Sequence, residues 1–398
     1  MIPADAAVAA DVYKAGRLAG SLWRVGDQVT FAYVDAYDGV PVAFTLPLGT
    51  LAVEDRFRLP PFFAGLLPEG DSRRRTLTRA LHVAEDDELG LLVHIGADTI
   101  GDVRIVPAGT ALATDDLGDP IDLATVSFAE LWQLPERVED RSSVAGVQPK
   151  ISAHSRSLIG GAAGRIILKL APDESWRGVL DNEALFMTAA REVGLAAPDV
   201  ALVTDRDQVR ALAVARFDRS VAGGQLLRHA QEDATQVLGL RPGAKYDPDA
   251  REVVGALADV CAAPAVARRD LLHQLLYSYA VGNNDVHAKN LSVGQDPRTG
   301  LWSVTPIYDV LHTWPYEGDH RFHPAVRDVP HDTVTRKHWT ALAHDLDVPR
   351  RVTDKLLDRV TAGVGPLLDQ LDADSLGMPE SWVRDVRRRL RKRLRDLA

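Results

Sequence analysis

The stretch "YAVGNNDVHAKNLSVG" (Tyr279–Gly294) places a cluster of polar side chains directly after an apolar run. The run "LLHQLLYSYAV" predicts a buried helix, "NNDVHAKN" predicts a loop, and "LSVG" predicts the start of a strand. A polar loop held between two regular elements is a poor core but a good frame for functional groups. We therefore expect the functional site to lie at this loop.

Two side chains of this loop, Asp285 and Asn290, lie five positions apart, and Asp309 follows in "VTPIYDVLHT" at the end of a predicted strand. Protein kinases use an Asp and an Asn at this spacing, and then a further Asp. Phosphoryl transfer needs a carboxylate that orients the attacking hydroxyl, and oxygen ligands that hold magnesium. Asp285 would be the base, and Asn290 and Asp309 the ligands. The spacing alone also fits a surface loop capped by Asn and Asp side chains.

One of only eight lysines, Lys169, lies inside the apolar run "IILKLAP". Burying a cation without a partner is costly. A kinase needs a strand lysine on the nucleotide phosphates and a glutamate on the next helix to position it. Glu183 follows fourteen residues later, where we expect it to open that helix. A lysine on an exposed strand edge is the alternative.

The segment "SSVAGVQPK" precedes the Lys169 strand, where a loop covering the nucleotide belongs. Its single glycine, Gly146, makes neither a glycine triad nor a Walker sequence. An ordinary loop between strands explains this segment equally well, so it supports the kinase interpretation only together with the other motifs.

The first half of the chain is rich in predicted strands. Short antiparallel strands are expected in "RLAGSLWRVGDQVTFAYVDAY" and "PVAFTLPL", with turns at Gly26-Asp27 and Asp38-Gly39, and a helix from Ser72. From about Gln231 onward the pattern is mainly helical. This asymmetry predicts an α+β, two-lobed protein with a β-rich N-terminal lobe, an α-rich C-terminal lobe and a nucleotide cleft between them. We expect a β-rich subdomain, an N-lobe with the phosphate loop and lysine strand, and a mainly helical C-lobe: residues 1–110, 111–225 and 226–398.

The composition is that of an ordinary globular protein, with 46% hydrophobic and 26% charged residues. A net charge of −10 argues against nucleic-acid binding over the whole surface. The single cysteine cannot form an internal disulfide, and no Cys/His cluster has zinc-ligand spacing. No stretch approaches the roughly 20 apolar residues of a membrane span. The first residues carry Asp5 and Asp11 around a short alanine run and contain no basic leader, so a signal peptide is not expected. A soluble cytoplasmic protein is expected.

Taken in order, these motifs resemble the HipA family, serine/threonine kinases that act as toxins of type II toxin–antitoxin systems. "PFFAGLLPEGDSRR" looks like the family's N-terminal signature and "SVAGVQPK" like its phosphate loop. "IILKLAP" with "NEALFMTAAREVGL" looks like its lysine strand and following helix, and "RFDR" with "HAQEDATQVLGLRPGAKY" like its hinge and inter-lobe segment. "GNNDVHAKNLS" and "PIYDVLHT" look like its catalytic and metal loops. The resemblance covers nearly the whole chain.

The resemblance implies ATP and Mg²⁺ as cofactors, Asp285 as the catalytic base, and Asn290 and Asp309 as magnesium ligands. It implies that Ser143 is autophosphorylated, which would expel the phosphate loop and switch the kinase off, because the added negative charge repels the ATP phosphates. Lys289 either reaches these phosphates or is solvated. The implied nucleotide pocket comprises Ser143, Val144, Ala145, Gly146, Gln148, Lys169, Glu183, Arg216, Phe217, Gln231 and Lys289.

The implied partners are a HipB-like helix-turn-helix antitoxin, operator DNA through the antitoxin complex, and a protein substrate from translation, such as glutamyl-tRNA synthetase. The basic C-terminal segment "VRDVRRRLRKRLRDLA" is either a solvated helix face or a contact with DNA phosphates. Two residues depart from the family pattern. Ala215 replaces a common hinge glutamate, and His312 replaces a common serine after the metal-loop Asp309. A small-molecule phosphotransferase and a decayed kinase kept in a repressor complex are the alternative functions.

Overall fold

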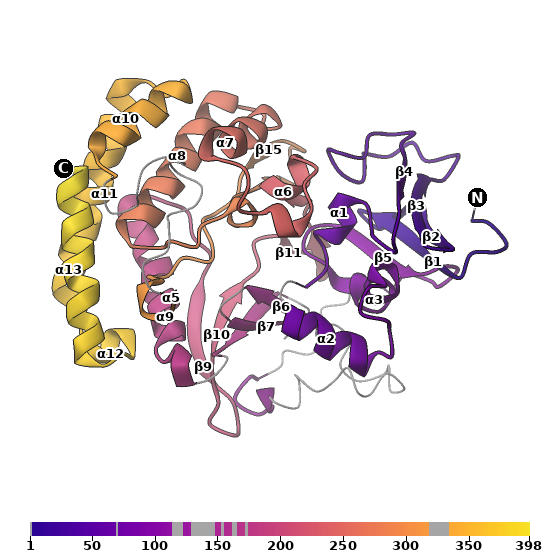
Figure 1. The fold of residues 1–398 in the computed structure, drawn as a ribbon, viewed down its shortest axis with the longest axis horizontal. Helices are drawn as coiled ribbons and strands as arrows, with labels where there is room; N and C mark the ends of the chain where they lie inside the picture. The colour runs from indigo at the N-terminus through magenta and orange to yellow at the C-terminus, as the bar shows by residue number, and fades with distance from the viewer. Residues whose placement is uncertain are drawn as a thin grey trace. The chain divides into compact units, whose positions relative to one another are not determined.

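The computed structural model describes residues 2–68, 71–113, 122–128, 148–152, 155–160, 165–171, 174–317 and 334–398. The chain forms two compact units (Figure 1). Unit 1 consists of Met1–Lys169, Val203–Arg210 and Asp218–Pro242, and unit 2 of Leu170–Leu202, Ala211–Phe217 and Gly243–Ala398. The three-part division at residues 110 and 225 stays a prediction.

Unit 1 begins with an antiparallel five-stranded sheet in the order β4-β3-β2-β1-β5. Its strands are β1 (Val8–Lys14), β2 (Arg17–Val25), β3 (Gln28–Tyr33), β4 (Leu51–Glu54) and β5 (Val103–Pro107). Gly26 has a φ of +60° in the turn between β2 and β3, as the turn at Gly26-Asp27 required. The alternation along these strands buries one face of the sheet, including Val12, Leu22 and Phe31.

The strand expected in "PVAFTLPL" does not form, so the predicted turn at Asp38-Gly39 joins no hairpin. Pro41 and Pro47 have no N–H to donate to a sheet ladder. The Val42 N–H donates instead to the Tyr33 hydroxyl, at 2.8 Å. The chain returns to the sheet only at β4.

Three helices of unit 1 pack their apolar residues into the core of this sheet. They are α1 (Pro61–Ala64), α2 (Asp71–Ala80) and α3 (Glu88–Ile95). The helix predicted from Ser72 is α2, which begins one residue earlier. At the N-terminus of α3, the Asp87 carboxylate accepts the Gly90 N–H at 2.9 Å, which satisfies one of the free backbone donors there.

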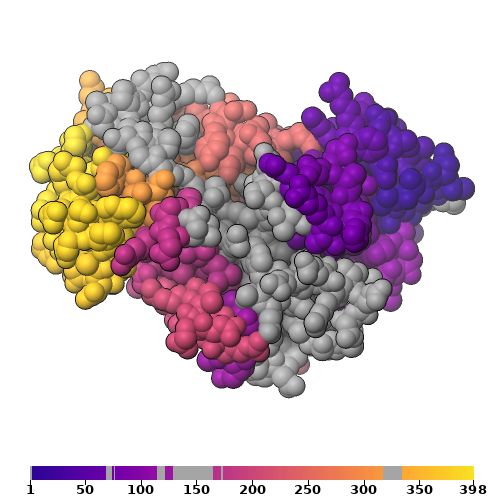
Figure 2. Space-filling model, turned by 60° about the horizontal axis from the view of Figure 1, so that its bottom comes forward, coloured from indigo at the N-terminus to yellow at the C-terminus, as the bar shows by residue number. Residues whose placement is uncertain are grey.

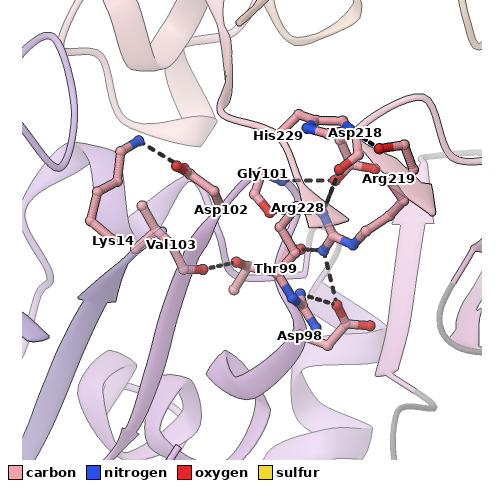
Figure 3. Close-up of polar contacts among 11 residues, drawn as sticks. Lys14, Asp98, Thr99, Gly101, Asp102, Val103, Asp218, Arg219, Arg228 and His229 are labelled. Atoms are coloured by element: carbon pink, nitrogen blue, oxygen red, sulfur yellow. Dashed lines mark hydrogen bonds and ion pairs between the residues drawn. The ribbon is translucent and has the colours of Figure 1, made fainter. Parts of the chain in front are cut away.

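The remaining elements of unit 1 are mostly short strands: β6 (Gln148–Ser152), β7 (Ser155–Gly160), β8 (Ile166–Leu170), β11 (Arg219–Ala222), β12 (Gln225–Arg228), β13 (Gln231–Asp233) and the helix α6 (Ala234–Val237). A buried polar network joins the β11–β12 hairpin to the segment before β5 (Figure 3). Asp98 Oδ1 accepts from Arg219 Nη2 at 3.0 Å and from Arg228 Nη1 at 2.6 Å.

A second carboxylate completes this network. Asp218 Oδ2 accepts from Arg219 Nη1 and from the Gly101 N–H, each at 2.8 Å. The Arg219 side chain is fully buried, so these pairings offset the cost of burying its charge. Gly101 has a φ of +86°, and a Cβ there would lie 3.3 Å from the Gln231 carbonyl oxygen. Glycine therefore allows the close approach that sets β13 beside this segment.

Unit 2 is mainly helical. It contains most of β9 (Val200–Thr204) and β10 (Arg210–Ala215), the antiparallel pair β14 (Ser292–Gln295) and β15 (Trp302–Val304), and the helices α5 (Val179–Ala189), α7 (Ala250–Asp259), α8 (Pro264–Ala280), α9 (Trp314–Glu317), α10 (Arg336–Asp345), α11 (Arg350–Gln370), α12 (Ala373–Leu376) and α13 (Glu380–Leu397).

The predicted buried helix is α8, which contacts α7, α11 and α13. Its residues from Leu271 to Ala280 are all buried. Two tyrosine hydroxyls find partners inside this core, since Tyr277 donates to the Phe186 carbonyl at 2.6 Å and Tyr279 to the Val334 carbonyl at 2.8 Å. The helix thus provides a rigid support for the polar loop that follows it.

The predicted start of α5 was wrong. We expected Glu183 to open this helix, but α5 begins at Val179, so Glu183 lies one turn inside it. At the other end, Gly194 with a φ of +79° ends the 3₁₀ turn that follows α5. A glycine in the left-handed conformation, Gly178, precedes α5 and allows this earlier start.

The C-terminal helix α13 lies on the surface of unit 2 (Figure 2). Its apolar side chains recur at helical spacing and are buried, while its exposed face carries Arg384, Arg388, Arg391, Lys392 and Arg395. Among the helices of the described ranges, none has the length and apolarity to cross a membrane.

Candidate functional site

Two loops of unit 2 meet at the end of α8. The Asn283 side-chain amide donates to the Asp309 carbonyl at 3.1 Å, and the Asn284 N–H donates to Thr313 Oγ1 at 3.1 Å. Both asparagines are buried, so these bonds are protected from water. They hold the predicted catalytic loop beside the predicted metal loop.

Asn290 and Asp309 lie in direct contact across the two loops. Asn290 Nδ2 donates to Asp309 Oδ2 at 3.0 Å, and Asn290 Oδ1 accepts the His287 N–H at 3.0 Å. The amide is therefore oriented from both sides. A carbonyl oxygen has two lone pairs, so Oδ1 can accept this N–H and still offer an electron pair to a cation.

The backbone of Asp309 differs from the prediction. We expected Asp309 at the end of a strand, but β15 ends at Val304 and the following residues are irregular. Asp309 has a φ of +58°, a left-handed conformation that is uncommon for residues other than glycine. Strained residues persist where their surroundings hold them, and the bonds from Asn283 and Asn290 do so here.

The pair fits a magnesium ion by the chemistry of its donors. Carboxylate and amide oxygens are hard ligands, and Mg²⁺ in phosphate-transfer sites takes only one or two protein ligands beside phosphate oxygens and water. Within the described ranges, no group of three or more His, Cys, Asp or Glu residues could bind a metal by itself. Asn290 and Asp309 would thus need the nucleotide phosphates to complete the coordination.

Asp285 contacts a tyrosine that the sequence reasoning missed. The Tyr246 hydroxyl donates to Asp285 Oδ1 at 2.6 Å, and the Asp285 N–H donates to Asn283 Oδ1 at 3.3 Å. The side chain of Asp285 is only partly buried, so a substrate can reach it. The carboxylate can orient a hydroxyl and accept its proton.

His312 supports the metal loop where many relatives are expected to carry serine. Its Nδ1 lies 2.9 Å from the Val281 carbonyl, and its backbone exchanges two hydrogen bonds of 2.9 Å with the Asn182 side chain. Burial lowers the pKa of His312 to about 3, so the ring is neutral at pH 7 and Nδ1–H donates to that carbonyl. The substitution leaves the loop well supported.

Arg393 of α13 braces the catalytic loop and was also missed. Its Nη2 donates to Asn284 Oδ1 at 2.7 Å and its Nη1 to the Tyr279 carbonyl at 2.6 Å. Its guanidinium carbon lies 4.7 Å from the centre of the Tyr279 ring. A signal was present, because Arg393 shares the helical face of the buried Val386 and Leu390.

The other predicted pocket residues lie in several elements. In unit 2, the Phe217 ring packs against Tyr308 with centroids 5.7 Å apart, and the Lys289 carbonyl accepts the Tyr308 hydroxyl at 2.7 Å. Arg216 and Glu183 are buried. In unit 1, Lys169 on β8 is 7% exposed, while Gln148 and Gln231 begin β6 and β13. Ser143, Val144, Ala145 and Gly146 lie outside the described residues.

Two ranges of the chain match models of known protein families. Residues 10–106 match the family described as the HipA N-terminal domain, and residues 142–366 match the HipA-like C-terminal domain. The Sinorhizobium fredii protein Y4dM is 33% identical over 341 residues, which cover 78% of either sequence. The serine/threonine-protein kinase toxin HipA of Shewanella oneidensis is 30% identical, over 70% of this chain and 68% of the toxin.

The fold has a solved counterpart. HipA from the Shewanella oneidensis complex of HipA, HipB and operator DNA superposes with a TM-score of 0.71, at 22% identity, over 97% of this chain and 96% of that one. The α+β architecture predicted from the sequence is therefore that of a two-lobed, kinase-like protein.

Proposed function

The chain belongs to the HipA family, and we propose that it is an ATP- and Mg²⁺-dependent serine/threonine protein kinase. One observation supports this most directly: Asn290 Nδ2 and Asp309 Oδ2 lie 3.0 Å apart, on two loops that a hydrogen bond from Asn283 joins. Asp285 lies on the same loop as Asn290. The proposed base and the two proposed oxygen ligands thus lie on loops that are bonded to each other. Phosphoryl transfer depends on such positioning more than on covalent chemistry.

In this mechanism Asp285 orients the substrate hydroxyl and accepts its proton, while the hydroxyl oxygen bonds to the γ-phosphorus and the bond to ADP breaks. Asn290 and Asp309 would hold Mg²⁺, which neutralises charge on the phosphates. Lys169 would bind the phosphates, and Glu183 would orient this lysine.

The rest of the pocket follows the family pattern. The hinge backbone at Arg216 and Phe217 would face adenine, and Gln231 and Lys289 would line the site. The phosphate loop, Ser143, Val144, Ala145 and Gly146 with the nearby Gln148, would cover the nucleotide. We propose that phosphorylation of Ser143 switches the kinase off, because a phosphate group adds about −1.5 to −2 charge beside the ATP phosphates.

We also propose that the protein is the cytoplasmic toxin of a type II toxin–antitoxin pair. Its partner would be a small helix-turn-helix antitoxin, through which it would join operator DNA. The superposed structure is a complex of HipA, HipB and operator DNA, which supports this proposal. Its substrate would be a translation component such as glutamyl-tRNA synthetase.

Incubation of the purified protein with ATP and Mg²⁺, followed by mass spectrometry, tests the activity. We expect phosphate on Ser143, and a loss of about 10²- to 10⁴-fold in the rate for Asp285→Asn, because a general base contributes this much. Asp309→Asn should lose transfer as well. The two variants should differ in binding: Asp285→Asn keeps the thermal stabilisation by ATP with Mg²⁺, and Asp309→Asn loses its Mg²⁺-dependent part.

The matched control is Asp345→Asn in the same unit. Asp345 forms an ion pair with Arg251 at 2.6 Å on the surface, with both side chains more than 40% exposed, so the rate should not change. If either active-site variant phosphorylated Ser143 like the parent, the proposed roles would be wrong.

A further inference from the structure

A short segment before α7 lies over the predicted catalytic loop. The Ala288 N–H donates to the Lys245 carbonyl at 3.1 Å, which fixes the backbone of this segment to the loop. The next residue, Tyr246, places its ring edge-on to His287, with ring centroids 5.1 Å apart and planes at 79°. The Lys245 ammonium lies 5.1 Å from the centre of the same ring. These contacts hold the tyrosine in one place although it is 39% exposed.

The hydroxyl of this tyrosine points at the predicted base. It lies 2.6 Å from Asp285 Oδ1. An ionised carboxylate only accepts hydrogen bonds, so the phenol is the donor. Hydrogen bonds to a charged acceptor are shorter and stronger than those between neutral groups. The torsion that turns an Asp carboxylate is soft, so a fixed donor on one oxygen decides the orientation of both.

We propose that Tyr246 is a positioning residue for phosphoryl transfer, whose hydroxyl holds the Asp285 carboxylate in the orientation that receives the substrate hydroxyl. This inference rests on the proposed function. Tyr246 takes up no proton and forms no bond to phosphorus. The substrate proton passes to Asp285, and ADP leaves. The tyrosine acts only through the carboxylate that it orients.

Tyr246→Phe is the appropriate perturbation, because it removes the hydroxyl and keeps the ring between His287 and Lys245. The probe is autophosphorylation in single-turnover experiments over a range of ATP concentrations. The maximal rate constant should fall about 10- to 150-fold, as expected for the loss of one hydrogen bond to a charged group. The ATP concentration for half-maximal rate and the melting temperature should stay at the parent values. A merely structural role would change these two quantities as well.

A double-variant comparison tests whether the effect passes through the base. The double variant Asp285→Asn/Tyr246→Phe should differ from Asp285→Asn alone by less than about 2-fold in rate, because the effects of coupled residues are not additive. Tyr37→Phe is the matched control. Its hydroxyl donates at 2.8 Å to the Val40 carbonyl in unit 1, and its loss should not affect the rate.

Four results would overturn the inference. Tyr246→Phe with the parent rate, or with an equal fall in the Asp285→Asn background, would remove the role of Tyr246 and leave the proposed kinase activity standing. A fall in rate that comes with a lower melting temperature and a higher ATP concentration for half-maximal rate would assign Tyr246 a role in folding alone. A parent protein that transfers no phosphate would refute the proposed function, and this role with it.

Discussion

Replacing Lys14 by methionine tests how much a buried ion pair contributes to the stability of unit 1. Lys14 Nζ lies 2.7 Å from Asp102 Oδ1, and the two side chains are only 5% and 7% exposed. Methionine keeps most of the aliphatic stem but removes the ammonium group. The Asp102 carboxylate would then stay buried without its cation.

The expected loss is large because the remaining charge has neither water nor a counter-ion. Removing one partner of a buried pair costs about 3–5 kcal/mol. For a unit of this size each kcal/mol lowers the melting temperature by about 2–4 °C. Lys14→Met should therefore lower the unfolding transition of unit 1 by about 6–20 °C. Differential scanning calorimetry measures this, because it can separate the transitions of the two units.

Two further variants decide whether the reasoning is right. Lys14→Met combined with Asp102→Leu should recover most of the loss, since an apolar pair of similar size has no charge to desolvate. Arg17→Met removes a cation from a pair in the same sheet whose side chains are 62% and 82% exposed, and should leave the transition unchanged. Equal losses for Lys14→Met and Arg17→Met, or no recovery in the double variant, would refute the argument.

Two other predictions concern single residues. Burial raises the pKa of Glu232 from 4.5 to about 8, so the folded protein holds a proton that the unfolded chain releases, and stability falls as the pH rises from about 4.5 to about 8. Urea unfolding at a series of pH values measures the free energy of unfolding, and Glu232→Gln should flatten its dependence on pH in this range. An unchanged slope would contradict this prediction. Gly282→Ala should lower the melting temperature and the phosphorylation rate, because its φ is +78° and a Cβ would lie 2.1 Å from His312 Nδ1. Gly255→Ala, whose Cβ would meet nothing within 4 Å, should be tolerated, and equal effects of the two changes would count against the steric explanation.

The sequence predicted the helix–loop–strand frame of the site because its signals are local. The apolar run of α8 and the polar loop after it are contiguous, and periodicity reports such segments well. The contact of Asn290 with Asp309 links loops that are nineteen residues apart. The kinase-like spacing predicted that these two residues act together. No periodic pattern in the sequence indicates their contact.

The predictions that failed depend on interactions between distant residues. The strand expected in "PVAFTLPL" has the right alternation, but the Tyr33 hydroxyl takes up one of its backbone donors. The early start of α5 depends on Gly178, where a Cβ would lie 2.3 Å from the Leu376 carbonyl. Tyr246 meets Asp285 from 39 residues away. Alternation and spacing cannot report such contacts, because each joins side chains or backbone from separate elements.

The number of basic residues in the C-terminal helix does not show which of them are exposed. Its arginines were expected to face either solvent or DNA phosphates, yet three of them contact other parts of unit 2. Arg387 donates to the Leu371 carbonyl. Arg393 bonds the catalytic-loop residue Asn284, and the Arg389 guanidinium lies 4.3 Å from the centre of the Trp314 ring. Only the exposed cations of α13 are open to an outside partner. Removing the helix would therefore remove a brace of the catalytic loop together with the basic surface, and these two effects can be separated only by changing the exposed arginines while Arg393 is kept.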